Sequence, residues 1–224
     1  YNSCTLSNGL RVIHRPSASR VVFCGYGVAA GSRHEAKDDE GIAHFCEHVT
    51  FKGTERRKAC HIINALERVG GDLNAFTTKQ ETVYYATVLR EDYARAADLL
   101  SDIVFHSTYP QGAITKEIEV ICDEIESFKD SPSELIFDEF EQRLFAGSPL
   151  GRDILGTARR LKTYTTADAL RAHLEPCIAV RHLGDRHNHL CHENSSNLWY
   201  NDHNQSIFLI GRTSQRPALF YAVC

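Results

Sequence analysis

Residues 41–54, GIAHFCEHVTFKGT, decide the fold and place two histidines and a glutamate within five positions. On an α-helix, positions i, i+3 and i+4 share one face, so His44 and His48 lie one turn apart with Glu47 beside them. Neutral imidazole is the commonest protein ligand of Zn²⁺. This spacing predicts a metal-binding helix, and the competing interpretation is a surface helix whose histidines and glutamate are incidental.

The segments on either side of this motif favour a helix. The acidic run KDDE at 37–40 precedes it and Lys52-Gly53 follows it, which suits the positive amino end and the negative carboxyl end of a helix dipole. The pattern H-x-x-E-H is typical of inverted zinc-peptidase motifs, in which a carboxylate accepts a proton from metal-activated water. A catalytic zinc also needs a third protein ligand and an open position for water.

The best source of a third ligand is the helix predicted after Pro110, where residues 115–130 read TKEIEVICDEIESFKD. At about 100° per residue, its apolar residues form one stripe: Ile118, Ile121, Ile125 and Phe128. Three carboxylates face the opposite side: Glu119, Asp123 and Glu126. Glu117 and Glu124 project along the edge of the stripe, where a carboxylate is costly unless it is paired or binds metal. The alternative is a pair of partly solvated helix carboxylates.

The remaining patterns predict strands and helices in blocks. An Asn-Gly pair between two short apolar segments indicates a hairpin over 3–17. Strands are predicted over 20–35, with a break at Gly31, and over 72–78 and 81–91. Helical spacing of apolar residues predicts helices over 59–69, 91–108, 115–130 and 133–147. Because the elements occur in blocks, the pattern favours an α+β fold over a strictly alternating α/β sheet.

Two of these segments together resemble a known family. HFCEH at 44–48, followed by EIEVICDEIESF at 117–128, is similar to the insulinase/pitrilysin peptidases and the mitochondrial processing peptidase subunits. GGDLNAFTTKQETVYY at 70–85 resembles the family's strand pair beside the active site, and SPLGRDILGT at 148–157 resembles a loop of its bacterial members. The likeness runs from about Leu6 to about Leu170. It implies a single insulinase/pitrilysin-like domain with a mostly antiparallel sheet packed against helices.

The resemblance also implies roles for individual residues. The family's third zinc ligand is a glutamate about 76 positions after the second histidine, and Glu124 lies at that distance from His48. His44, His48 and Glu124 would then hold one Zn²⁺, and Glu47 would be the general base. Glu117 would form a hydrogen bond to a ligand histidine or to the water. Three residues would line the substrate cleft along an exposed strand edge: Asn74, Ala75 and Phe76.

The function implied is a zinc metalloprotease, a hydrolase that cuts peptide bonds of extended peptides through a metal-activated water. Members of this family are usually built from pairs of such domains, so activity is expected to require a companion domain or subunit. The alternative is a non-catalytic or truncated partner subunit of the same fold. An intact zinc motif counts against that alternative, because non-catalytic members tend to lose these residues.

The resemblance stops near His173. We therefore divide the chain into a metallopeptidase domain over 1–173 and an atypical tail over 174–224, which is rich in histidine and asparagine. The tail has no clear helix or strand period. We interpret it as a reading-frame change or a poorly ordered segment, and the encoding DNA would test the first of these.

Composition limits the other classes of function. A formal net charge of −4 favours neither nucleic acid nor an anionic membrane surface. There is no apolar run long enough for a membrane span and no recognisable signal peptide, although the N-terminus is expected to be incomplete. The eight cysteines form no CxxC pair, which predicts reduced, mostly buried thiols and a cytoplasmic location. Cys46 and Cys122 face away from the ligands on their helices and are predicted core residues.

Overall fold

A computed structural model describes residues 1–6, 10–173 and 209–210 of the chain. Within these ranges, six strands form one sheet in the order β1-β2-β6-β3-β5-β4. Their bounds are Asn2–Thr5 (β1), Arg11–His14 (β2), Val21–Val28 (β3), Asp72–Thr77 (β4), Thr82–Leu89 (β5) and Leu209–Ile210 (β6). All strand pairs are antiparallel except the short β3–β6 pair. The predicted α+β class with a mostly antiparallel sheet is therefore confirmed.

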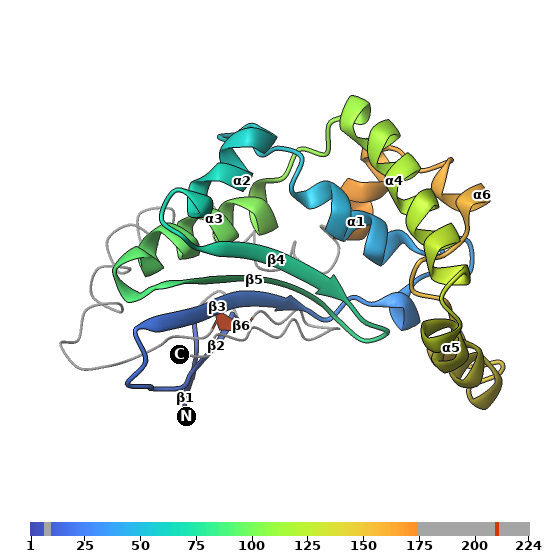
Figure 1. Cartoon of the computed structure of the whole chain (residues 1–224), viewed down its shortest axis with the longest axis horizontal. Helices are drawn as coiled ribbons and strands as arrows, with labels where there is room; N and C mark the ends of the chain where they lie inside the picture. Colours follow the sequence, from blue (N-terminus) through green and yellow to red (C-terminus); the bar gives the residue numbers. More distant parts are fainter. Residues whose placement is uncertain (7–9, 174–208, 211–224) are drawn as a thin grey trace.

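Six labelled α-helices, α1 to α6, accompany the sheet in the described residues, and α1 to α4 lie on one side of it (Figure 1). Their bounds are Ile42–Thr50 (α1), Ala59–Glu67 (α2), Tyr93–His106 (α3), Gln111–Lys129 (α4), Pro132–Leu144 (α5) and Ala158–Leu161 (α6). Residues 166–173 are also helical. The predicted strands and the five longer helices are confirmed, whereas α6 is too short to leave a periodic signal.

Two hydrophobic clusters hold these layers together. The first joins the sheet to α2 and α3, and fully buried side chains at its centre include Leu66, Leu99 and Ile103. The second packs α1 against α4 and the segment after α6, with Phe45, Val49 and Ile121 completely buried. Because the second cluster fixes α1 on α4, it brings the motif helix against the carboxylate-rich helix that follows Pro110.

Strand β4 lies at one end of the sheet and pairs only with β5 within the described residues. Its burial alternates residue by residue, as expected for a strand with one covered face. This strand contacts α1 as well as β5. One edge of β4 therefore carries backbone groups without a strand partner in the described part of the chain.

Three further sequence expectations concern the rest of the chain. None of the described helices is long and apolar enough to cross a membrane. Among the five described cysteines, Cys24 and Cys46 are buried, but Cys4 and Cys60 are exposed, so the expectation of mostly buried thiols is wrong for those two. The tail of 174–224, with the frame-change hypothesis, lies outside the described residues except for strand β6.

Candidate functional site

Helix α1 carries the motif, and its first turn is held by a carboxylate from outside the helix. Glu35 accepts hydrogen bonds from the backbone N–H groups of Gly41 and Ala43, both at 3.0 Å. These are among the N–H groups that have no partner inside a helix. The acidic residue that holds this helix end is therefore Glu35 and not one of the predicted run at 37–40, whose Asp39 pairs instead with Arg160 and Arg171.

Gly41 begins α1 in a conformation that favours glycine. Its φ is 80°, in the left-handed region. A Cβ atom at this position would lie 2.6 Å from the carbonyl oxygen of Leu155 and 2.8 Å from the Cα of Gly156. The start of the motif helix is therefore packed directly against the 148–157 segment.

Burial raises the pKa of Glu35 to about 7, although its two backbone hydrogen bonds and the nearby Arg152 oppose that shift. Arg152 also donates to the backbone carbonyl of Glu35. The carboxylate that caps α1 therefore titrates close to neutral pH.

The second half of the site comes from α4. Glu117 is buried, and the predicted water-facing carboxylates Glu119, Asp123 and Glu126 are exposed. The side chain of Glu124 is 44 % exposed and reaches towards α1. Glu117 is therefore at the buried edge of the apolar stripe, as predicted, whereas the Glu124 side chain is partly exposed to solvent.

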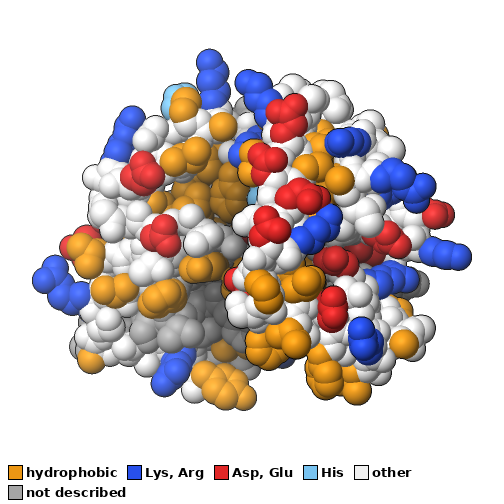
Figure 2. All heavy atoms as spheres, turned by 45° about the vertical axis from the view of Figure 1, so that its right-hand side comes forward, with side chains coloured by type: hydrophobic (Ala, Val, Ile, Leu, Met, Phe, Trp, Pro, Cys, Tyr) orange, Lys and Arg blue, Asp and Glu red, His pale blue; other side chains and the backbone are white. Residues whose placement is uncertain are grey.

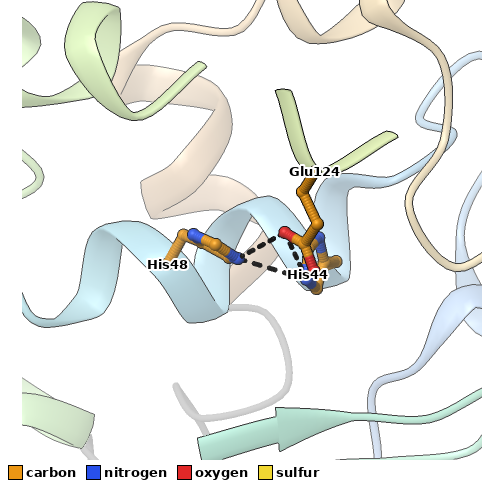
Figure 3. Close-up of side chains that lie close together, drawn as sticks. All are labelled: His44, His48 and Glu124. Atoms are coloured by element: carbon orange, nitrogen blue, oxygen red, sulfur yellow. Dashed lines mark hydrogen bonds and ion pairs between the residues drawn. The ribbon is translucent and has the colours of Figure 1, made fainter. Parts of the chain in front are cut away.

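The structure brings His44, His48 and Glu124 together (Figure 3). The two imidazole Nε2 atoms are 3.2 Å apart. Glu124 Oε2 lies 3.8 Å from His44 Nε2 and 3.4 Å from His48 Nε2. No other group of three metal-ligating side chains is this close within the described residues.

These distances fit a zinc ion. Bonds of about 2.0–2.1 Å at tetrahedral angles separate two donor atoms by about 3.3 Å. The three observed separations of 3.2, 3.4 and 3.8 Å lie near that value. Two imidazole nitrogens and one carboxylate oxygen are also the donors that zinc prefers in sites with an open fourth position.

Glu117 lies directly behind His48. Its Oε1 is 3.1 Å from His48 Nδ1, and its Oε2 is 2.6 Å from the ammonium group of Lys52. With a metal ion bound, a proton on Nδ1 that is donated to Glu117 would leave the lone pair of Nε2 for the ion. Lys52 was missed by sequence reasoning, which treated it as a helix end, because its partner lies on a distant helix.

The two histidines have opposite electrostatic surroundings. Burial, and next the charge of His48, lowers the pKa of His44 to about 4. Burial also acts to lower the pKa of His48, but hydrogen bonds to Glu117 and Glu124 raise it to about 9. His44 Nδ1 is buried and has no hydrogen-bond partner in the described part of the chain. His44 is therefore held as the neutral imidazole that metal binding requires.

Glu47 points from α1 towards strand β4, where Thr77 donates a hydrogen bond to its Oε2 at 2.5 Å. Burial raises the pKa of Glu47 against the opposing effect of that hydrogen bond. A carboxylate with a raised pKa is a better proton acceptor near neutral pH than an ordinary one. Glu47 is next to His48 on α1 and is close enough for the charges of His48 and Glu124 to affect its pKa, but it is not one of the three metal-ligating residues.

The three predicted substrate-binding residues lie on β4. Ala75 packs on the covered face of the sheet, whereas the Phe76 side chain is 45 % exposed and its ring lies 6.1 Å from that of Tyr85. Asn74 Oδ1 accepts a hydrogen bond from the backbone N–H of Ala75. Figure 2 shows a hollow in the face that it draws, with a column of acidic side chains beside it.

The cysteines near the motif segments lie as predicted. Cys46 is buried in the cluster between α1 and α4, and its thiol points to the carbonyl oxygen of Ala169 at 3.8 Å. Cys122 packs against the same cluster from α4. Cys46 is a core residue and Cys122 is a partly buried residue at the edge of that cluster, and neither is among the three metal-ligating residues.

Comparisons with known proteins bear on the same segments. The model of the insulinase family, peptidase family M16, matches residues 11–158. The uncharacterized zinc protease YmxG of Bacillus subtilis is 38% identical over 172 residues, which cover 76% of this chain and 42% of that protein. The mitochondrial-processing peptidase subunit beta of Dictyostelium discoideum is 37% identical over 183 residues, or 81% of this chain and 38% of the relative.

Solved structures show the same fold. A protease from Helicobacter pylori matches with a TM-score of 0.73 at 23% identity, over 96% of this chain and 47% of that one. A peptidase M16 inactive domain from Pseudomonas fluorescens matches with a TM-score of 0.69 at 19% identity, over 77% and 42%. The chain thus spans less than half the length of each of these relatives.

Proposed function

Because this chain belongs to the insulinase family of peptidases, peptidase family M16, we propose that it is a zinc-dependent half-domain of an endopeptidase. The observation that carries the proposal is the cluster of three metal-ligating atoms from α1 and α4, with Glu47 next to His48 on α1. The names of relatives as zinc proteases support the choice of metal.

His44, His48 and Glu124 would hold the ion, and a bound zinc supplies a Lewis acid that lowers the pKa of water to about 7. Glu47 would act as the general base and would then return the proton to the leaving amine of the cut peptide bond. Glu117 would keep His48 in the tautomer whose Nε2 is free for the metal, because it accepts a hydrogen bond from Nδ1–H. The reaction class is hydrolysis of a peptide bond.

The substrate would be a peptide in extended conformation. Strand β4 has a free edge within the described residues and contacts α1, which carries Glu47. A peptide added to that edge gains backbone hydrogen bonds, which give affinity with a loose preference for side chains. Asn74, Ala75 and Phe76 would then flank the bound peptide.

A companion domain or subunit would complete the enzyme. The relatives are more than twice as long as the part matched here, and one of them is named as a subunit. Residues on the facing half would contribute further contacts to the peptide. The second candidate is a non-catalytic partner subunit. It is supported by the structural match to a peptidase M16 domain that is described as inactive, which has the same fold.

Metal content and cleavage separate these candidates. We expect one zinc per chain after purification without chelators, and cleavage of a quenched fluorescent peptide when the companion half is added. Glu47→Gln should abolish cleavage and keep the zinc, because Glu47 is not a ligand. Glu119→Gln, an exposed carboxylate on α4, is the matched control and should cleave normally. Absence of zinc from the wild-type protein, or full activity of Glu47→Gln, would contradict the proposal.

A further inference from the structure

A threonine on the edge strand contacts the proposed base. Thr77 is the last residue of β4, and its hydroxyl donates to Glu47 Oε2 across 30 positions of sequence. This is the one hydrogen bond of the Glu47 side chain to a described residue that the structure shows. The other carboxylate oxygen, Oε1, has no such partner there. One oxygen of Glu47 is therefore held, and the other is available to accept a proton.

The direction of the Thr77 hydrogen bond follows from its neighbours. Thr82 Oγ1 lies 3.3 Å from Thr77 Oγ1, but the Thr82 hydroxyl donates at 2.8 Å to the backbone carbonyl of Ala30. A hydroxyl has one proton to donate. The Thr77 proton is directed to Glu47 because a carboxylate oxygen can only accept, and because Oε2 at 2.5 Å is much closer than Thr82 Oγ1 at 3.3 Å.

The anchoring of Thr77 makes it a rigid support. Its backbone is paired with Thr82 at the end of the β4–β5 ladder, and its β-branched side chain has restricted rotation about χ1. Glu47 is a longer and more flexible side chain that no ion pair holds within the described part of the chain. A single short hydrogen bond from a rigid strand therefore limits which orientations the carboxylate adopts.

We propose that Thr77 is a positioning residue that orients the carboxylate of Glu47 for proton transfer. This inference rests on the proposed peptidase function and adds a residue to it. Thr77 belongs to the strand whose free edge would bind the peptide. The same strand would therefore fix the position of Glu47 relative to the peptide bond. The hydrogen bonds of the Thr77 side chain to described residues go to Glu47 and Thr82 and to none of the three metal-ligating side chains, so its role is separable from metal binding.

Thr77→Val, Thr77→Ser and Thr87→Val test this role. Valine keeps the branched shape and lacks the hydroxyl, and serine keeps the hydroxyl without the methyl group. Thr87 lies on β5 and its side chain has no hydrogen bond in the described structure. Thr87→Val therefore controls for the general effect of replacing a strand threonine by valine. We expect Thr77→Val to lower kcat by about 10- to 100-fold, since misplacement of a catalytic group by about 1 Å costs about 100-fold. KM and zinc content should stay unchanged.

Thr77→Ser should recover most of kcat, and Thr87→Val should match the wild type. The inference is overturned if kcat of Thr77→Val stays within twofold of the wild type, or if Thr77→Ser is as impaired as Thr77→Val. Thermal unfolding checks that each variant is folded, and Thr77→Ala replaces Thr77→Val if the latter fails to fold.

A second measurement keeps the test independent of activity. If the wild-type protein with its companion cleaves no peptide, the proposed function fails, and crystal structures decide the role of Thr77. We expect the Glu47 carboxylate to move or to adopt several conformers in Thr77→Val and to keep its place in Thr77→Ser. An unmoved Glu47 carboxylate in Thr77→Val would show that Thr77 does not position it.

Discussion

Replacing Glu117 tests whether the carboxylate behind His48 strengthens metal binding. One of its oxygens accepts from His48 Nδ1 at 3.1 Å and the other pairs with Lys52 at 2.6 Å. A hydrogen bond to a charged group contributes about 1.5–3 kcal/mol, and a neutral one about 0.5–1.5 kcal/mol. The amide of Glu117→Gln still accepts from His48 but has no charge. We expect it to weaken zinc binding by about 1–1.5 kcal/mol, or about tenfold.

Glu117→Ala removes the acceptor altogether and should weaken zinc binding by about 100-fold. That is the upper end of the effect measured for residues that hydrogen-bond to a ligand histidine. Zinc affinity would be measured at neutral pH by competition with a chromophoric chelator. Glu119→Gln removes an exposed carboxylate from the same helix and should leave the affinity unchanged, which controls for general electrostatics. Equal affinities for the wild type and all three variants would refute the role of Glu117.

Two further predictions concern the start of α1. Gly41→Ala should lower the free energy of unfolding by at least about 2 kcal/mol, since the left-handed conformation costs about 1–2 kcal/mol and the new Cβ would lie 2.6 Å from the Leu155 carbonyl. Urea unfolding measures this change. The control is Gly112→Ala, which should leave the free energy of unfolding unchanged because a Cβ there meets open space. Burial raises the folded-state pKa of Glu35 from 4.5 to about 7, so its contribution to stability is largest below pH 4.5 and is lost as pH rises through 7. The free energy of unfolding of the wild type, relative to that of Glu35→Gln, should therefore fall by on the order of 3 kcal/mol between pH 4.5 and pH 7. A difference in urea midpoints that does not change with pH would contradict this.

The secondary structure and part of the site follow from local patterns in the sequence. His44 and His48 share a helix face because they are four apart, and Glu117 and Glu124 share one because they are seven apart. The five longer helices and the hairpin strands follow from apolar periodicity and turn residues in the same way. These relations depend only on backbone geometry within a few turns, so they can be predicted without knowledge of the rest of the fold.

Other contacts of the site depend on residues far apart in the chain. Lys52 reaches Glu117 on α4, and Glu35 caps α1 from a preceding turn. A lysine at a helix end and a glutamate in a loop carry no pattern that identifies such partners. Their roles follow from how α1 packs on α4 and on the 148–157 segment.

The sequence by itself determined which helix faces bear imidazole and carboxylate, because a helix repeats its side-chain directions every few residues. Only the tertiary structure decided that the His44, His48 and Glu124 donor atoms lie 3.2 to 3.8 Å apart and that Thr77 holds Glu47. Those distances are set by the close packing of α1 between α4 and strand β4. Such packing depends on the shapes of many side chains at once and leaves no local period in the chain.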